Sequence, residues 1–382
     1  MSLLALVCSV IGVLVLVMAV CGAVFSCLAT GVLRAFLRRP VTISPSRPSV
    51  TVLRPLHGDE PELYENLASL CDQTYAGAMR LVLGAQSPTD PALDVARRIQ
   101  AERADIDIVV ICDGASHGTN RKISNLINMS RYAHGETIVI SDSDVSMPPD
   151  GVTKIVAALD DPEIGLVYCL YRGKPTASFW SHLAAMDINT RFAPNVVVGE
   201  ALGACPCLGP TMALRTEMLA AIGGFEHLSN FLADDFELGR AVREAGYRVA
   251  CPSMLIDHVF PERSLHEMLT HELRWARTVR LIEPAGYLGS VIVHFTPLAW
   301  IGAALTGFGP WAVGLAVALM LVRIGQAYWL SQLMSFERRC LWLTPLRDVL
   351  SLAVFLGAIF GDHVEWRGAH MRVRRSGAMV AT

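Results

Sequence analysis

The stretch Thr137-Ile138-Val139-Ile140-Ser141-Asp142-Ser143-Asp144 gives the clearest indication of the fold. Its apolar half predicts a buried β-strand, and two carboxylates follow where that strand ends. Around it, short apolar runs alternate with helix-like stretches from residue 48 to residue 281. This alternation is typical of an α/β domain in which helices cover a mainly parallel sheet. We therefore predict an α/β domain over residues 48–281.

Several polar residues directly follow the predicted strands of this sheet. The strands are expected at residues 50–53, 81–84, 106–111 and 137–140, and helices are expected at 62–70, 93–99 and 125–132. Ligands of such sheets bind beside the carboxyl ends of the strands. The polar residues that fall there are His57, Asp90, Asp113, Asp142 and Asp144.

Apolar sequence before this domain predicts a membrane anchor at residues 1–33. Residues 3–33 carry no charge and are long enough to span a bilayer. A cleaved signal peptide would need a positive start, which Met1-Ser2-Leu3 does not supply. Arg34, Arg38 and Arg39 follow directly, so the positive-inside rule places that end in the cytoplasm.

A second apolar block at residues 288–362 predicts C-terminal membrane helices. Gly307-Phe308-Gly309-Pro310 divides its first part into two spans. A shorter run at 349–360 precedes a basic tail at 363–382, which contains Arg367, Arg372, Arg374 and Arg375. A third crossing would place this tail outside, so we favour a re-entrant or interfacial segment. We expect a multi-pass protein of the inner membrane whose α/β domain faces the cytoplasm.

Composition excludes some partners and site types. Of 382 residues, 52% are hydrophobic and 18% charged, and the net charge of -3 gives no basic field for nucleic acid. The ten cysteines lack metal-type spacing, since the closest pair, Cys205 and Cys207, is C-x-C. We expect reduced thiols and no disulfide framework.

The acidic residues suggest a cation site and a base. Asp142 and Asp144 offer hard oxygen ligands for Mg²⁺ or Mn²⁺, which could hold a diphosphate, although a solvated turn is the alternative. Asp234 and Asp235 stand in an apolar frame, where an acid is costly without a partner or role. Asp235 could serve as a general base, or either acid could cap the following helix.

Two basic segments complete the candidate residues. His271 and Arg274 fall on one face of a likely helix, where Arg274 could bind a diphosphate and Trp275 could provide a flat apolar wall. An interfacial basic-aromatic helix is the alternative. Gly118-Thr119-Asn120-Arg121-Lys122 predicts a flexible loop with two cations, suited to phosphate contact or simply solvated.

These residues together resemble the ceramide glucosyltransferase family (glycosyltransferase family 21), and most of all its bacterial hopanoid-biosynthesis-associated branch. The resemblance runs from the first span to the tail. It is carried by Arg54-Pro55-Leu56-His57-Gly58, Asp90-Pro91-Ala92, the segment from Gly118 to Leu126, Asp142-Ser143-Asp144, Ala233-Asp234-Asp235, Arg274-Trp275 and Trp366-Arg367.

The resemblance implies a GT-A nucleotide-sugar domain that inverts the anomeric carbon. It implies Asp90 for the nucleotide, Asp142 for the metal and diphosphate, and Asp235 as base. Asp144 stands where eukaryotic ceramide enzymes have Gly, and His271 occupies the first position of a (Q/R)-x-x-R-W motif. The expected nucleotide-sugar contacts are Pro55, His57, Asp90, Lys122, Asp142, Asp234 and His271. Arg274 and Trp275 join Asp235 as expected catalytic residues, and Asp142 and Asp144 as metal ligands.

The function implied is transfer of a sugar from UDP-glucose or UDP-N-acetylglucosamine to a lipid hydroxyl. The acceptor would be a hopanoid such as bacteriohopanetetrol, or ceramide. A processive polysaccharide synthase of the glycosyltransferase 2 type has the same catalytic parts, but it usually needs more spans than this chain has. A non-catalytic membrane scaffold that binds nucleotide-sugars is the alternative from another class.

Overall fold

The computed structural model describes residues 2–40, 45–204, 206–361, 363–366, 369–373 and 377–381. The chain forms two compact units. One is an α/β unit made of residues 37–176, 203–261 and 371–382, and the other is a helical unit made of residues 1–36, 177–202 and 262–370. Of the residues named above, Met1, Cys205, Arg367, Arg374 and Arg375 lie outside the described ones.

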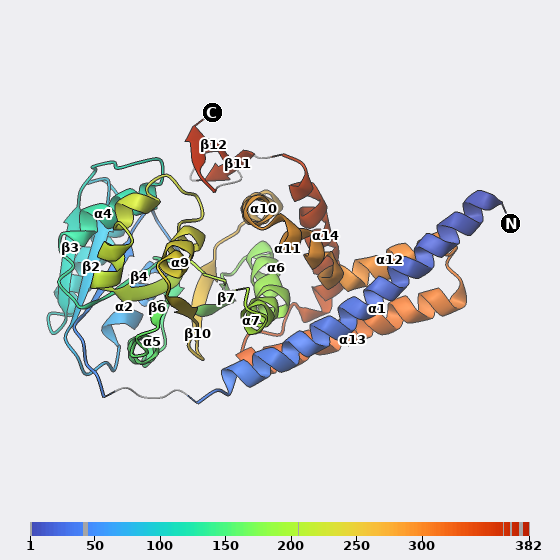
Figure 1. The fold of residues 1–382 in the computed structure, drawn as a ribbon, viewed down its shortest axis with the longest axis horizontal. Helices are drawn as coiled ribbons and strands as arrows, with labels where there is room; N and C mark the ends of the chain where they lie inside the picture. Colours follow the sequence, from blue (N-terminus) through green and yellow to red (C-terminus); the bar gives the residue numbers. More distant parts are fainter. Residues whose placement is uncertain are drawn as a thin grey trace. The chain divides into compact units, whose positions relative to one another are not determined.

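The α/β unit is built on a seven-stranded sheet (Figure 1). Its strand order is β3-β2-β1-β4-β8-β6-β9. Neighbours β1/β2, β2/β3, β1/β4 and β6/β9 are parallel, and β8 runs antiparallel to both β4 and β6, so the sheet is mainly parallel as predicted. The strands are β1 Val50–Pro55, β2 Met79–Ala85, β3 Asp107–Cys112, β4 Thr137–Ser141, β6 Ile164–Tyr168, β8 Thr211–Arg215 and β9 Arg248–Ala250.

Helices pack against this sheet because their apolar faces match its buried surface. Helices α3, α4, α5 and α9 contact its strands. Their apolar residues recur at helical spacing, as with Ile123, Leu126 and Ile127 in α4. The helices of this unit are α2 Leu63–Cys71, α3 Ala92–Glu102, α4 Arg121–Ser130, α5 Gly151–Leu159, α8 Thr216–Ala221, the 3₁₀ turn η2 Phe225–Leu228 and α9 Asp234–Glu244.

One expected loop is wrong. The sequence predicts a flexible loop through Lys122 and a helix from residue 125, but α4 begins at Arg121. The reason is a helix cap, because the side chain of Asn120 accepts a hydrogen bond from the backbone N–H of Ile123 at 3.1 Å. Arg121 and Lys122 therefore stand on the first turn of a helix.

A second sheet of three strands places a histidine beside the acidic turn. Its order is β5-β10-β7, and His258 of β10 pairs with Val145 of β5. The backbone N–H of Val259 donates to the carbonyl of Asp144 at 2.8 Å. The strands are β5 Val145–Ser146, β7 Leu170–Pro175 and β10 Leu255–Phe260.

The C-terminal residues return to the α/β unit. Ala378 forms an isolated antiparallel bridge with Phe231. The N–H of Leu232 donates to the carbonyl of Gly377 at 3.1 Å, and the N–H of Met379 donates to the carbonyl of Asn230 at 2.9 Å. The strands near this end are β11 His363–Trp366, β12 Ala369–Val373 and β13 Met379–Ala381.

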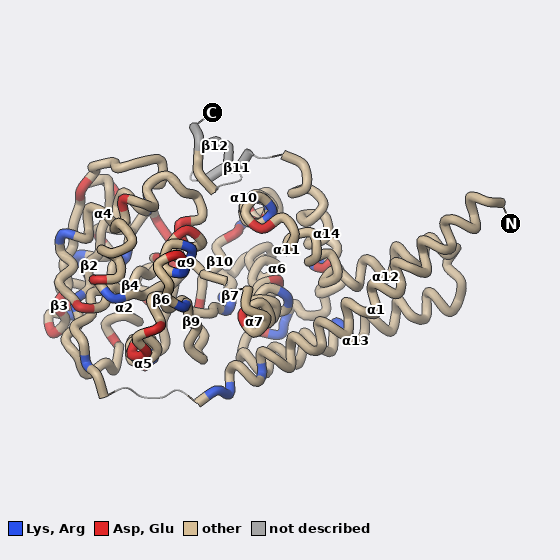
Figure 2. The backbone as a smooth tube through the Cα atoms, viewed as in Figure 1, with Lys and Arg blue, Asp and Glu red and all other residues tan. Residues whose placement is uncertain are grey.

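In the helical unit, apolar helices carry few charges (Figure 2). Among the described residues, four helical stretches are long and apolar enough to cross a membrane: Leu3–Leu37, Pro284–Leu305, Pro310–Met334 and Leu341–Ile359. The helices of this unit are α1 Leu3–Leu37, α6 Phe179–Asp187, the π-helical η1 Ile188–Phe192, α7 Ala193–Ala201, α10 Leu265–Ile282, α11 Pro284–Gly289, η3 Ser290–His294, α12 Phe295–Leu305, α13 Pro310–Met334, η4 Leu341–Leu343 and α14 Thr344–Ile359.

Small residues let the apolar helices approach closely. A Cβ on Gly12 of α1 would stand 3.0 Å from the carbonyl oxygen of Gly302 in α12, so only glycine fits there without a shift. Alanines continue this contact, with Ala19, Ala23, Ala299, Ala303, Ala312 and Ala316 buried in one cluster. Close packing of this kind holds helices together in a bilayer, where burial of apolar surface alone gives no driving force.

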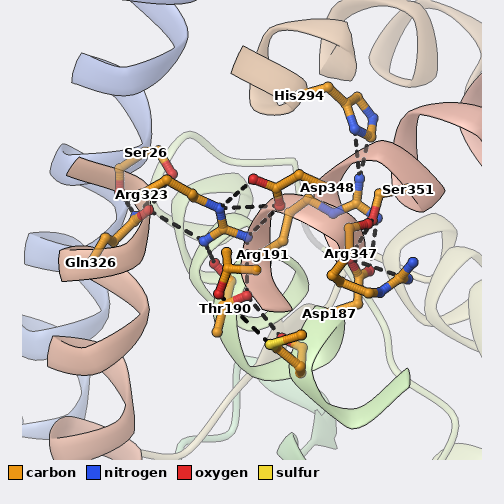
Figure 3. A network of polar contacts seen from close by, with 12 residues as sticks. Ser26, Asp187, Thr190, Arg191, His294, Arg323, Gln326, Arg347, Asp348 and Ser351 are labelled. Carbon is orange, nitrogen blue, oxygen red and sulfur yellow. Dashed lines mark hydrogen bonds and ion pairs between the residues drawn. The ribbon is translucent and has the colours of Figure 1, made fainter. Parts of the chain in front are cut away.

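A buried polar network also ties these helices together (Figure 3). Arg323 of α13 donates to both carboxylate oxygens of Asp348 in α14 at 3.0 to 3.2 Å. It also donates to the carbonyl and hydroxyl of Thr190 in η1. Gln326 extends the network to α1, donating to the carbonyl of Ser26 at 2.7 Å. Because water is scarce there, each of these groups depends on its partners.

We predict that replacing one partner of the Arg323–Asp348 pair destabilises the protein more than replacing both partners. Asp348→Leu leaves a buried guanidinium without its counter-ion, which costs about 3–5 kcal/mol. Arg323→Met combined with Asp348→Leu removes both charges and fills the space. Thermal unfolding of the detergent-solubilised protein should give the lower Tm for the single variant. The double variant having the lower Tm would contradict this role of the pair.

Candidate active site

The acidic turn follows β4 directly, at the carboxyl end of the parallel strands. The N–H of Asp142 donates to the carbonyl of Pro210 at 2.9 Å, which fixes the start of the turn. The side chains of Asp142 and Asp144 are 29% and 35% exposed, so a ligand can reach both. His57, Asp90 and Asp113 follow β1, β2 and β3, as the strand pattern predicts.

Asp144 has one occupied and one open oxygen. Its Oδ2 lies 3.1 Å from Nε2 of His258, while its buried Oδ1 has no hydrogen-bond partner among the described residues. Burial opposes ionisation of this carboxyl, but His258 and Arg54 lower its pKa to about 2. The rings of Tyr171 and Phe260 flank His258 at centroid distances of 5.1 and 5.0 Å.

Arg54 lies beneath the turn as a fully buried cation. Its Nη2 donates to the carbonyl of Ser143 at 3.2 Å and also to the carbonyl of Val145. Burial lowers the pKa of Arg54 to about 10, although the nearby charge of Asp144 raises it. A guanidinium with that pKa is still protonated at neutral pH, so Arg54 both shapes the turn and offsets its negative charge.

Lys122 joins the acidic turn to the second pair of acids. Its Nζ lies 2.7 Å from Oδ1 of Asp142 and 3.6 Å from Oδ2 of Asp234. Burial alone would lower the pKa of Lys122, but these two carboxylates raise it well above its usual value. Burial raises the pKa of Asp142, and Lys122 opposes this rise. A single ammonium therefore holds together two segments that are about 90 residues apart in the sequence.

The acids Asp234 and Asp235 begin α9 without capping it. Ala233 occupies the cap position, so the capping alternative does not hold for either acid. Asp235 Oδ1 accepts the N–H of Phe236 at 2.8 Å, and a Cβ on Gly209 would stand 3.1 Å from its Oδ2. Burial and the neighbouring charge of Asp234 raise the pKa of Asp235 to about 6. That value leaves a carboxylate at neutral pH that accepts a proton readily.

Asp90 organises the loops around it. Its Oδ1 accepts the N–H of Gly58 at 2.9 Å and that of Ala92 at 3.0 Å, and its Oδ2 lies 3.6 Å from Nδ1 of His57. These bonds join the loop that follows Pro55, the last residue of β1, to the start of α3. The half-exposed ring of His57 is the part of this group most open to a ligand.

His271, Arg274 and Trp275 form a cluster on α10, in the helical unit rather than the α/β unit. Nδ1 of His271 lies 2.7 Å from Oε1 of Glu262, and its ring meets the ring of Trp275 edge-on at 4.3 Å. The Arg274 guanidinium lies 5.9 Å from the centre of the Trp275 ring. The predicted helix is therefore present, and these three side chains lie together on it.

The donor set beside the acidic turn suits a divalent cation. Asp142 and Asp144 offer carboxylate oxygens, and Oδ1 of Asp144 is buried without a partner among the described residues. His258 orients Asp144, because its Nε2 lies 3.1 Å from Oδ2. Mg²⁺ commonly binds one or two carboxylates plus substrate phosphates, and carboxylates also suit Mn²⁺. Across the described ranges, no group of three or more His, Cys, Asp or Glu side chains could hold a metal ion by itself. A diphosphate could supply the remaining ligands.

Two residues of the site were missed from the sequence. His258 follows the turn by 114 positions and lies inside an apolar strand, which favours the interpretation of a core residue. Arg54 lies near the end of a buried strand, where an arginine is itself a signal of a functional or structural role. The cap formed by Asn120 could also have been recognised, because Asn before a helix-like stretch is a start signal.

Comparison with known proteins gives the family and the fold. Residues 14–379 match the family described as glycosyl transferase family 21. Ceramide glucosyltransferase 1 of Caenorhabditis elegans is 28% identical over 56% of this chain and 46% of its own length. An N-acetylglucosaminyltransferase of Rhizobium leguminosarum bv. viciae is 28% identical over 60% of this chain and 55% of its own length. The chain thus spans about half the length of these curated relatives.

A solved structure shows the same fold. Mannosyltransferase PcManGT from Pyrobaculum calidifontis, in complex with GDP-Man and Mn²⁺, matches with a TM-score of 0.51 at 20% sequence identity. The match covers 91% of this chain and 99% of that one. The predicted GT-A fold and the predicted family are both confirmed. With four helices able to cross a bilayer, the chain is a membrane protein and belongs to glycosyl transferase family 21.

Proposed function

We propose that this protein is a membrane-bound inverting glycosyltransferase that transfers one sugar from a UDP-sugar to a lipid hydroxyl. The observation that carries this proposal is the contact of Lys122 with both Asp142 and Asp234. That contact joins the acidic turn, to which we assign the diphosphate, to Asp234, the neighbour of the proposed base Asp235. A transferase needs both, because one group must hold the departing nucleotide while another takes the proton of the incoming hydroxyl.

Asp235 is the proposed general base. Its carboxylate takes the proton from the acceptor hydroxyl while the hydroxyl oxygen bonds to the anomeric carbon. The bond between that carbon and the β-phosphate oxygen breaks, and UDP leaves with the electron pair. A base with a pKa near 6 is ionised at neutral pH and remains a better proton acceptor than an ordinary aspartate.

Asp142 and Asp144 would hold a Mg²⁺ or Mn²⁺ ion, with His258 orienting Asp144. When bound, such an ion offsets the charge that develops on the departing diphosphate. Mannosyltransferase PcManGT, which has the same fold, was solved with GDP-Man and Mn²⁺, which supports a divalent metal in this site. Lys122 and Arg54 add fixed positive charge beside the ion. We assign nucleotide contacts to Pro55, His57, Asp90 and Asp234 on the α/β unit.

The α10 cluster supplies the remaining proposed groups. Arg274 offers a planar fork that suits a diphosphate, and Trp275 offers a flat face to a sugar or lipid head group. His271 is held by Glu262, so its ring is fixed beside Trp275. We assign Arg274 and Trp275 to the catalytic set and His271 to donor binding.

The donor is UDP-glucose or UDP-N-acetylglucosamine, and the acceptor is a hopanoid or ceramide. The names of the two relatives, a ceramide glucosyltransferase and an N-acetylglucosaminyltransferase, support both donors. The anchor and the apolar helices suit an acceptor that stays dissolved in the bilayer. The hopanoid acceptor rests on the motif resemblance to the bacterial branch.

We propose that the α/β unit faces the cytoplasm of the inner membrane, where Arg34, Arg38 and Arg39 place the end of the anchor. The α/β unit includes residues on both sides of the C-terminal helices, up to Pro261 and from Met371. The chain between them must cross the bilayer an even number of times. Three candidate spans lie there, so one of them does not cross the bilayer. We assign α14 as the helix that does not cross, because it carries the buried charged residues Arg347 and Asp348.

The proposed function is tested with purified full-length protein, UDP-sugars and extracted membrane lipids. We expect one sugar on a lipid, detected by mass spectrometry. Asp235→Asn should lower the transfer rate by about 10²–10⁴-fold and leave UDP binding nearly unchanged, because the amide accepts no proton. A polymer would indicate a processive synthase, and UDP binding without transfer would indicate a scaffold. Retained turnover in Asp235→Asn would remove Asp235 as the base.

We predict that transfer declines as pH falls through about 6. The pKa of Asp235 is raised to about 6, so its ionised fraction, which is the form that accepts a proton, falls below that pH. Asp144 has a pKa of about 2 and stays ionised throughout this range. The dependence of kcat/KM on pH should therefore show an acid limb near 6. A flat profile across that region would contradict the assignment.

We predict that His258→Ala weakens Mn²⁺ binding. Loss of the imidazole removes the group that orients Asp144 through its Oδ2, so affinity should fall by about 10–100-fold. Electron paramagnetic resonance of Mn²⁺ measures this without any sugar transfer. The exposed His134 provides a matched control, since His134→Ala should bind Mn²⁺ as the wild type does. Equal affinity in both variants would exclude His258 from the site.

A further inference from the structure

The C-terminal end of the chain pairs with the segment that leads into the two acids of α9. Residues 377–379 run antiparallel to residues 230–232 and exchange two backbone hydrogen bonds with them. Met379 is only 5% exposed, so its side chain as well as its backbone is packed there. The carbonyl of Gly377 and the N–H of Met379 make these bonds, while Ala378 faces Phe231 without one.

The opposite side of the same segment contacts the loop before α4. The N–H of Asn120 donates to the carbonyl of Ser229 at 2.8 Å, and its side-chain amide donates to the carbonyl of Phe231 at 2.8 Å. The N–H of Thr119 donates to Oδ1 of Asn230 at 3.1 Å. Residues 229–232 are therefore held between the α4 loop on one side and the C-terminal end on the other.

The bonds of this segment continue into the site. The amide of Asn120 also lies 3.4 Å from Oδ1 of Asp234, and Asn120 caps the helix that carries Lys122. Asp235 follows Leu232 by three residues. A shift of residues 229–232 would move the two acids of α9, one of which, Asp234, is a partner of Lys122.

We propose that Gly377, Ala378 and Met379 are positioning residues of the active site, holding residues 229–232 so that Asp235 meets the acceptor hydroxyl. This inference rests on the proposed function of Asp235. Asp235 Oδ1 accepts the N–H of its own neighbour Phe236, so the position of this carboxylate follows that of the backbone leading into α9. Strand pairing supplies the missing constraint, since two backbone bonds fix the register of a short segment.

The arrangement links the last apolar helix to the site. After α14 ends at Ile359, the chain returns to the α/β unit and reaches residues 230–232 with its final residues. The site is therefore complete only when the C-terminal end has returned from the membrane. A catalytic domain that stops before the C-terminal helices would lack this constraint.

The first test compares Met379→Pro with Met379→Ala in the full-length protein. Both variants lose the Met379 side chain, but only proline also removes the N–H that bonds to Asn230. We expect Met379→Pro to lower kcat by about 10–100-fold relative to Met379→Ala, as displaced catalytic groups do. UDP affinity should fall less than kcat, because Asp142, to which the diphosphate is assigned, is fixed by its own bond to the carbonyl of Pro210 and not by residues 229–232. Equal kcat in the two variants would overturn the positioning role.

A second test covers the case in which Met379→Pro folds poorly. Phe231 and Ala378 form a pair without hydrogen bonds, whose Cα atoms stand about 4.5 Å apart in such bridges. Cysteines at both positions should form a disulfide, detected by mass spectrometry of the oxidised protein. In the Met379→Pro background, oxidation should restore activity and reduction should remove it again.

The outcomes separate this inference from the proposed function. If the variant with cysteines at 231 and 378 forms the disulfide but the wild-type protein transfers no sugar, the proposed function of the site is overturned, and with it the role of the C-terminal residues in catalysis. An active protein in which the two cysteines never form a disulfide would overturn the pairing alone. Restored activity on oxidation is the result that the inference predicts.

Discussion

The contact of Lys122 with Asp142 and Asp234 is the interaction on which the site depends. The two carboxylates come from different parts of the sheet architecture, one from the end of β4 and the other from the start of α9. Without a cation between them, these buried acids would repel each other and separate. The cap made by Asn120 places Lys122 at that point, because α4 then begins at Arg121, directly before the lysine.

The balance of charge explains how the acids differ in chemistry. Arg54 and His258 keep Asp144 ionised, so it remains available to a cation. Burial and the neighbouring charge of Asp234 raise the pKa of Asp235 to about 6. Burial raises the pKa of both acids. Their pKa values differ because Asp144 has the cations His258 and Arg54 nearby, whereas Asp235 has the carboxylate of Asp234. One site thus holds a permanent anion beside a proton acceptor, as group transfer requires.

Much of the fold and part of the site follow from the sequence. The α/β pattern, the strand before Asp142 and the apolar spans were predicted because their signals are local. The start of α4 was missed because a single cap outweighed the weak loop signal of Gly118. His258 and the C-terminal pairing could not be found from local pattern. His258 reaches Asp144 across 114 positions, and residues 377–379 pair with a segment almost 150 positions away.

The central claim is that one cleft of the α/β unit holds a nucleotide diphosphate against the acidic turn and beside Asp235. A cryo-electron microscopy structure of the full-length protein in a lipid nanodisc, with UDP and Mn²⁺ bound, tests it most directly. The account predicts Mn²⁺ between the diphosphate and the Asp142–Asp144 turn, with Lys122 close to a phosphate and Asp235 facing the open side. A diphosphate bound away from the acidic turn, or Asp235 turned away from it, would contradict the account.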